Sequence, residues 1–262
     1  MISSLATEGI RGVLLDIEGT TTPIAFVHEV LFSYARSQVR NFLTKHFGSA
    51  ELLADLQQLR EEHATDVKQK LQPPALVNID VDVDVNGPRD AEIDSLTDYV
   101  SWLIDRDRKS TGLKSLQGKI WKEGYSDGTL KAELFAEVAP ALERWRQAGL
   151  KISIFSSGSS LAQKLLFAHT AAGDLTGFID NYFDTTVGSK TDVASYRRIA
   201  SALKLPAQNI LFISDVVPEL DAARAAGMQT LLCIRPGNPP QPFAERYQGI
   251  RDFDEIQIHI PD

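Results

Sequence analysis

Two acidic residues stand at the ends of short apolar runs, where a carboxylate is well placed to do chemistry. Asp16 closes the run 12–15, and Glu18 follows two residues later. Asp215 comes after Ser214 at the end of a second apolar run, 209–213. Ligands bind at the carboxyl ends of strands in open α/β sheets. Carboxylates that converge from two strand ends are costly without a cation between them, and ligation by oxygen alone suits Mg²⁺.

Two further features supply groups that can hold an anion. Ser156 and Ser157 follow the apolar run 152–155 and precede a helical pattern. Hydroxyls and backbone N–H groups at such a helix start can bind an anion. Lys190 stands just before another predicted helix. Each feature also has an ordinary structural explanation, because serines cap helices and a lone lysine is usually a solvated surface charge.

The elements that must position these residues are clearest in the second half of the chain. From residue 134 onward, apolar strands alternate with helices, which is typical of a parallel sheet covered on both faces. We expect strands over 151–155, 209–213 and 230–234, and helices over 134–149, 159–169, 192–203 and 218–226. The first strand, 12–16, should join the same sheet.

A helical pattern of about a hundred residues separates that first strand from the rest of the sheet. Its first candidate buried face consists of Phe26, Val30, Leu31, Tyr34, Val39 and Phe42. An insertion explains this order most simply. We therefore predict a doubly wound, mostly parallel α/β core formed by residues 1–22 and 134–262, and an inserted, mainly helical cap formed by residues 23–133.

Along the chain, the features come in the order acid, hydroxyl, lysine and acid, and this order resembles the motifs of the haloacid dehalogenase superfamily of phosphatases. The resemblance implies that the first carboxylate attacks phosphorus while the hydroxyl and the lysine hold the phosphoryl oxygens. It implies a Mg²⁺ ion that neutralises charge during transfer. The inserted segment is similar to the cap of that superfamily, which closes over the site and excludes bulk water.

A closer resemblance involves five segments. They are Leu15 to Ile24 with Phe26-Val27, Ile120 to Tyr125, Phe155 to Ser159, Gln163 to Phe167, and Arg235 to Asn238. Together they resemble the acireductone synthase family, the bifunctional enolase-phosphatases of methionine salvage, over nearly the whole chain. The resemblance implies that the chain enolises 2,3-diketo-5-methylthiopentyl-1-phosphate and then removes the phosphate to yield the acireductone, 1,2-dihydroxy-3-keto-5-methylthiopentene.

The resemblance also implies roles for individual residues. Its Mg²⁺ positions are Asp16, Glu18 and Asp215. Its substrate contacts are Ser156, Ser157 and Lys190. Most superfamily phosphatases have aspartate at the position of Glu18, and that residue often reaches the metal through its backbone carbonyl. The Glu18 side chain would then be free for proton transfer. The base for enolisation stays open between Glu18, Lys190 and residues of the cap.

Composition bears on the partners and the compartment. The net charge of −8 argues against broad binding to nucleic acid or to an anionic membrane, which needs a basic surface. The single cysteine, Cys233, excludes an intrachain disulfide and suits a reducing compartment. No apolar segment is long enough to span a membrane, and the first residues lack the pattern of a signal peptide. We expect a cytoplasmic monomer that acts on a small phosphate ester.

Three other functions compete with this prediction. The first alternative is a capped phosphatase of the same superfamily that acts on another small phosphate ester without enolase activity. A dehalogenase that uses Asp16 against carbon would need no set of metal-binding carboxylates. A binding module without catalysis would leave the converging acids and Lys190 unexplained.

Three further patterns receive ordinary structural interpretations. Residues 82–87 begin like a calcium-binding EF-hand loop, but the twelfth position holds Ile93 instead of glutamate, so we predict a solvated acidic loop. Trp121 and Tyr125 could line an apolar pocket for a thioether tail, although aromatic residues near a domain junction more often pack. Cys233 lies within an apolar strand, where we expect inert core.

Overall fold

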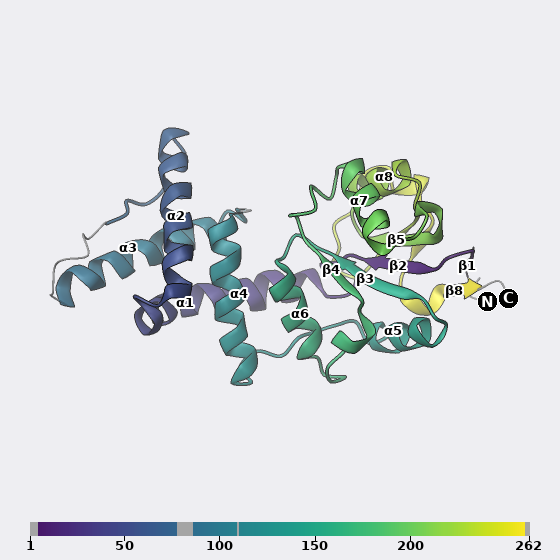
Figure 1. Ribbon diagram of the computed structural model, residues 1–262, viewed down its shortest axis with the longest axis horizontal. Helices are drawn as coiled ribbons and strands as arrows, with labels where there is room; N and C mark the ends of the chain where they lie inside the picture. The colour runs from purple at the N-terminus through teal and green to yellow at the C-terminus, as the bar shows by residue number, and fades with distance from the viewer. Residues whose placement is uncertain (1–4, 78–85, 109, 260–262) are drawn as a thin grey trace. The chain divides into compact units, whose positions relative to one another are not determined.

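The computed structural model of the chain describes residues 5–77, 86–108 and 110–259. The acidic stretch 82–87 lies mostly outside the described residues, and its last two residues begin a helix. The chain divides into two compact units, one formed by residues 1–27 and 131–262 and the other by residues 28–130 (Figure 1). The sequence placed the corresponding boundaries at 22/23 and 133/134.

A six-stranded parallel sheet organises the first unit, with strand order β4-β3-β2-β5-β6-β7. These strands are β2 (Gly12–Leu15), β3 (Lys151–Phe155), β4 (Asn181–Phe183), β5 (Ile210–Ser214), β6 (Gln229–Cys233) and β7 (Gly249–Ile250). Strand β2 is central, because Leu15 pairs with Ile154 of β3 on one side and with Ile213 of β5 on the other. The carboxyl ends of these three strands therefore lie together at one edge of the sheet.

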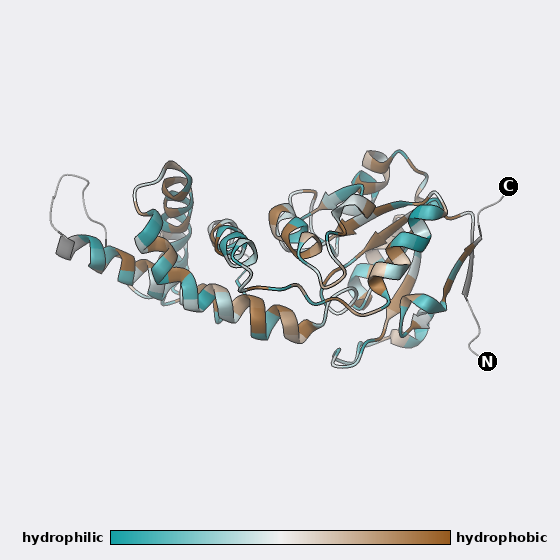
Figure 2. Cartoon of the chain, turned by 90° about the horizontal axis from the view of Figure 1, so that it is seen from below, coloured by the Kyte–Doolittle hydropathy of each residue, from teal (hydrophilic) through white to brown (hydrophobic). Residues whose placement is uncertain are grey.

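Helices cover both faces of this sheet, as predicted for a doubly wound core. They are α5 (Val138–Gln147), α6 (Ser160–Ala168), α7 (Val193–Leu203) and α8 (Val217–Ala225). Helix α5 packs on β3, while α8 packs on β5 and β6, and Figure 1 shows α5 and α8 on opposite faces. Leu14, Phe155, Phe212 and Leu220 are fully buried in one of the resulting cores. Figure 2 shows the strands of the unit as mostly hydrophobic.

Shorter elements complete the first unit. A separate two-stranded sheet pairs β1 (Leu5–Glu8) with β8 (Ile256–His259) in parallel. Single 3-10 turns are η2 (Thr176–Phe178), η3 (Ala207–Asn209), η4 (Ala244–Arg246) and η5 (Phe253–Glu255). Cys233 is 1% exposed, and burial raises the pKa of its thiol to about 12. This supports the prediction of an inert core cysteine.

The second unit is helical, as the sequence predicted. A π-helical segment η1 (Phe26–Phe32) leads into α1 (Ser33–His46), and α2 (Ala50–Lys68), α3 (Asn86–Ile104) and α4 (Thr111–Ser126) follow. Helix α2 packs against α4, and α1 packs against α3 and α4. Ser49 and Ser110 cap α2 and α4, because each hydroxyl accepts a hydrogen bond from a backbone N–H of the first turn. No helix in the described ranges is both long and apolar enough to cross a membrane.

The prediction for Val30 was wrong. Phe26, Leu31, Val39 and Phe42 are buried as expected, whereas Val30 is 41% exposed. The reason is the π-helical segment, whose wider turn changes the angular position of each residue and so breaks the 3.6-residue period on which the prediction depended.

Trp121 of α4 packs inside the second unit, and Tyr125 of the same helix is buried. Trp121 Nε1 donates a hydrogen bond to Leu31 O at 2.8 Å, and the indole stacks against Phe32. Tyr125 is 4% exposed. A side chain on Gly124 would collide with the ring of Tyr34, because an added Cβ would lie 2.6 Å from the hydroxyl. The contacts of Trp121 and the burial of Tyr125 favour packing over a pocket role for these two side chains.

Candidate active site

Asp16 and Lys190 meet at the carboxyl edge of the sheet. Asp16 directly follows β2 and is 4% exposed. Its Oδ1 accepts a hydrogen bond from Ile17 N at 2.8 Å and lies 2.5 Å from Lys190 Nζ. The same Nζ lies 2.7 Å from Glu219 Oε2. Burial alone lowers the pKa of Lys190, but the carboxylates of Asp16 and Glu219 raise it above its usual value, so the lysine stays charged.

The end of β5 adds a hydroxyl and a third acid to this cluster. Ser214 Oγ donates to Glu219 Oε2 at 3.0 Å and lies 3.4 Å from Asp16 Oδ2. Asp215 is 5% exposed, and burial together with the nearby carboxylates of Asp16 and Glu219 raises its pKa to about 8. Burial, followed by the charge of Asp16, also raises the pKa of Glu219. The cluster therefore holds three carboxyl groups around one ammonium group, Lys190.

The loop after β2 lies close to Asp215 and is hydrogen-bonded by the side chains of Asn238 and Arg235. Gly19 has a φ of +70°, which glycine adopts at no steric cost, and a Cβ there would collide with Asp215 Oδ2. Asn238 Nδ2 donates to Gly19 O at 2.9 Å. Arg235 donates to Thr20 O from Nε at 3.2 Å and from Nη2 at 2.9 Å. The segment that follows β6 therefore fixes the loop that follows Asp16.

Ser156 and Ser157 lie at the end of β3, the strand next to β2. Ser156 is buried and Ser157 is half-buried. The backbone N–H of Ser156 donates to Phe183 O at 3.1 Å, and Gly158 N donates to Ser156 Oγ at 3.2 Å. Because β2 and β3 are parallel neighbours, this serine loop follows β3 at the same edge of the sheet at which Asp16 follows β2.

Glu18 is half-buried in the loop after Asp16, and its backbone forms an isolated bridge with Thr22. Among the described residues, no three His, Cys, Asp or Glu side chains are grouped as a ready metal site. A cation held by Asp16 and Asp215 would therefore complete its ligands with backbone carbonyls and water. The donor set consists of oxygen only, which suits a hard divalent cation.

The structure thus brings Asp16, Lys190 and Asp215 together, with Glu18 in the loop beside them and the serine loop on the neighbouring strand. Sequence reasoning did not assign Glu219, whose signal was an acid four residues after Asp215 at a helix start. It also gave no role to Arg235 or Asn238, although both belong to a segment that carried the family resemblance.

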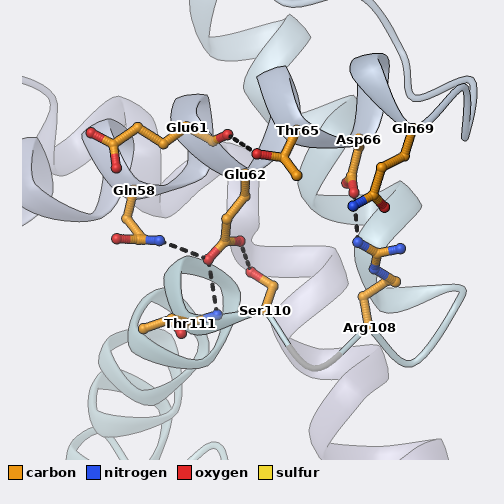
Figure 3. A pocket seen from close by; sticks show the side chains of 9 residues that line it. All are labelled: Gln58, Glu61, Glu62, Thr65, Asp66, Gln69, Arg108, Ser110 and Thr111. Atoms are coloured by element: carbon orange, nitrogen blue, oxygen red, sulfur yellow. Dashed lines mark hydrogen bonds and ion pairs between the residues drawn. The ribbon is translucent and has the colours of Figure 1, made fainter.

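A cavity of about 570 Å³ lies in the second unit, beside α2 and the start of α4 (Figure 3). Glu62 Oε1 accepts hydrogen bonds from Thr111 N at 3.0 Å and Gly112 N at 3.1 Å, which caps α4. Asp66 pairs with Arg108 at 2.5 Å. These acids hold the helix start, and none of the predicted catalytic residues lines the cavity.

Comparisons with known proteins identify the family. Residues 10–227 match the family model of haloacid dehalogenase-like hydrolases. The chain is 49% identical over 250 residues to Enolase-phosphatase E1 of Synechococcus elongatus, covering 94% of this chain and 98% of the relative. It is 42% identical over 251 residues to Enolase-phosphatase E1 of Erwinia tasmaniensis, covering 96% and 98%. The crystal structure of the UTR4 protein from Saccharomyces cerevisiae matches with a TM-score of 0.72 at 32% identity, covering 94% of this chain and 99% of that chain. The chain therefore belongs to the Enolase-phosphatase E1 family of haloacid dehalogenase-like hydrolases.

Proposed function

We propose that this enzyme is a Mg²⁺-dependent enolase-phosphatase that converts 2,3-diketo-5-methylthiopentyl-1-phosphate to the acireductone and phosphate in methionine salvage. Relatives named Enolase-phosphatase E1 that align over nearly the whole chain support the paired activities. The observation that best supports the phosphatase activity is the contact between Asp16 Oδ1 and Lys190 Nζ. It joins a buried carboxylate that can attack phosphorus to a cation that can hold a phosphoryl oxygen.

We assign residues 1–27 with 131–262 to the catalytic core and residues 28–130 to the cap. In support, Asp16, Lys190 and Asp215 all belong to the first unit, whereas the second is helical and contributes none of the predicted catalytic residues. We further propose a cytoplasmic, monomeric enzyme whose substrate is a small phosphate ester and not a nucleic acid. The acidic net charge of −8 and the single, buried Cys233 support this proposal.

In the phosphatase half, a carboxylate oxygen of Asp16 attacks phosphorus, and the bond between phosphorus and the ester oxygen breaks. The products of this step are an aspartyl-phosphate on Asp16 and the dephosphorylated enol. Lys190, Ser156 and Ser157 hold the phosphoryl oxygens as charge develops on them. Glu18 gives a proton to the leaving oxygen. It then takes a proton from the water that attacks phosphorus of the aspartyl-phosphate. The bond between phosphorus and Asp16 breaks, which releases phosphate and restores the Asp16 carboxylate and the protonated Glu18.

The residues at the site fit a magnesium ion. Lys190 pairs with Asp16 and Glu219, and both carboxylates raise the pKa of Asp215, so the cluster has more acidic groups than its ammonium group can neutralise. Asp16, Asp215 and the backbone carbonyl of Glu18 would hold the ion, and all of these ligands are oxygens. When bound, Mg²⁺ neutralises charge on the phosphoryl group and polarises the carbonyl beside the carbon that loses a proton during enolisation.

Asp215→Ala should raise the Mg²⁺ concentration for half-maximal activity about tenfold or more, since one of two carboxylate ligands is lost. The melting temperature should change little, because the substitution also removes a buried carboxyl group from beside two others. Magnesium titrations and thermal unfolding measure the two effects. Asp221→Ala is the control, because Asp221 pairs with Arg246 on the surface. A lower melting temperature with unchanged magnesium dependence would make Asp215 a structural residue.

Glu18→Asp should be a poor enzyme even though aspartate is the commoner residue in the superfamily. The shorter side chain withdraws the carboxyl group by roughly a bond length, and misplacement on the order of 1 Å can cost about a hundredfold in rate. If Glu18 serves phosphate release alone, the variant should accumulate the enol phosphate. If it serves enolisation as well, both steps should slow together. A single-turnover time course that records enol formation and phosphate release separates these cases, and wild-type rates for both would remove Glu18 from the mechanism.

The proposed function is tested by incubating the purified protein with Mg²⁺ and the diketo phosphate while enol absorbance and phosphate release are followed separately. We expect enol absorbance to rise before phosphate appears, and both signals to disappear when magnesium is chelated. Phosphate release from other small esters without any enolase activity on the diketo phosphate would instead identify a capped phosphatase without the enolase step.

A further inference from the structure

The carbonyl groups of two consecutive residues after the nucleophile are bound by one distant segment. Asn238 Nδ2 donates to Gly19 O at 2.9 Å. Arg235 donates twice to Thr20 O, at 3.2 Å and 2.9 Å. Both donors belong to residues 235–238, which follow β6 after Ile234. Three side-chain hydrogen bonds therefore fix two peptide groups that begin only three residues after Asp16.

Arg235 is itself firmly anchored. It is 5% exposed, and its Nη2 lies 2.5 Å from Glu137 Oε1. Its Nη1 donates to Arg251 O at 2.7 Å, and its guanidinium lies over the ring of Phe135 at 4.2 Å. A buried charge is tolerated where it is paired and hydrogen-bonded, as here. These contacts fix the position of the Arg235 guanidinium. Its two hydrogen bonds to Thr20 O therefore fix the position of the Thr20 carbonyl as well.

The loop also has little room to move. A Cβ on Gly19 would collide with Asp215 Oδ2 and would lie 3.1 Å from Asn238 Nδ2. Gly19 thus lies close to both Asp215 and Asn238 and is covalently joined to Glu18. A shift of Gly19 would therefore displace the neighbouring Glu18. It would also change the close contact between Gly19 and the Asp215 carboxyl group.

We propose that Asn238 and Arg235 are positioning residues of the reaction, which hold the Gly19–Thr20 backbone so that Glu18 and Asp215 keep their places around the nucleophile. Neither side chain contacts substrate in this proposal. The inference rests on the proposed function, because it assumes that Glu18 transfers protons and that Asp215 holds the cation. Rigid support of this kind matters because small errors in catalytic geometry reduce rate more than they reduce binding.

Asn238→Ala is the test, and Asn209→Ala is its matched control. Asn209 Nδ2 makes the same kind of hydrogen bond, to Gly9 O at 2.5 Å, at the opposite end of the sheet where β2 and β5 begin. We expect similar, small losses of melting temperature in the two variants. We expect kcat for phosphate release to fall on the order of tenfold in Asn238→Ala only, with KM changed less than about twofold. The magnesium concentration for half-maximal activity should rise in the same variant.

Equal kcat in Asn238→Ala and Asn209→Ala would overturn the positioning role. The role would also fail if the activity lost in Asn238→Ala were fully explained by the fraction of that variant that is unfolded. Arg235→Lys provides a second measurement. It keeps a positive charge to pair with Glu137 but lacks the two guanidinium N–H groups that donate to Thr20 O. Wild-type kcat in a folded Arg235→Lys would also count against the positioning role. The proposed function fails separately. Activity in Asp16→Asn would overturn the aspartyl-phosphate, whereas wild-type kcat in Asn238→Ala would overturn only the positioning role.

Discussion

Asp16→Asn should reduce phosphate release on the order of 10⁴-fold or more, because the amide is a poor nucleophile and a weaker ligand for magnesium. The substitution keeps the size of the side chain and leaves the backbone of β2 unchanged, so the folded structure should persist. Lys190 keeps Glu219 as a partner in this variant. Steady-state phosphate release, measured beside circular dichroism, separates loss of chemistry from loss of fold.

Asp180→Asn is the matched control for that variant. Asp180 is also a carboxylate of the first unit, but it pairs with Arg146 at 2.9 Å and accepts a hydrogen bond from Ile152 N at the start of β3. It thus lies at the edge of the sheet opposite the site. We expect wild-type kcat in Asp180→Asn. Retained turnover in Asp16→Asn would show that Asp16 is not the nucleophile.

Lys190→Met should lower phosphate release on the order of 10³-fold, because the cation that holds a phosphoryl oxygen is lost. It should also lower the free energy of unfolding by about 3–5 kcal/mol, since removing one partner of a buried ion pair leaves uncompensated charge. That charge belongs to Asp16 and Glu219, whose carboxylates would face each other in a buried site. Denaturant unfolding and phosphate release measure the two losses separately.

The double variant Lys190→Met/Glu219→Gln separates stability from catalysis. Removing the Glu219 carboxylate should restore part of the lost stability, because Asp16 then has one like charge fewer beside it, and the two substitutions should therefore be non-additive. Phosphate release should stay low. If phosphate release recovered as well, Lys190 would serve only as a counter-ion for Glu219 and not as a contact for the phosphoryl group.

Most of the core fold could be predicted because its central strands have an unambiguous pattern. Strand β5 is buried throughout, and β3 is buried at every residue but its first, which a parallel sheet covered on both faces requires. Strand β4 was not predicted, because its three partly buried residues show no alternation. The helix expected from Leu134 begins only at Val138, since the apolar stripe extends into the loop before it. The π-helical turn of Phe26–Phe32 was not predicted either, because no sequence pattern marks it as clearly as the apolar runs mark the strands.

The site was predictable where each group stands at a strand end. Asp16, Ser156 and Asp215 all follow apolar runs, so the sheet alone brings them to one edge. The pairing of Lys190 with Glu219 was not predictable, because the two residues come from separate segments that only the packed fold brings together. Arg235 was missed for a different reason. An arginine after a strand is usually solvated, and its burial against Glu137 and Phe135 depends on long-range packing that sequence patterns do not encode.

The most direct test of the account is a search for the covalent intermediate on residue 16. The enzyme is mixed with Mg²⁺ and the diketo phosphate, quenched in acid within one turnover and treated with borohydride, which reduces an aspartyl-phosphate to homoserine. Peptide mass spectrometry then identifies the reduced residue. We predict homoserine at position 16, at a level that falls when magnesium is chelated. A burst of phosphate with residue 16 unmodified and another carboxylate reduced in its place would contradict the account.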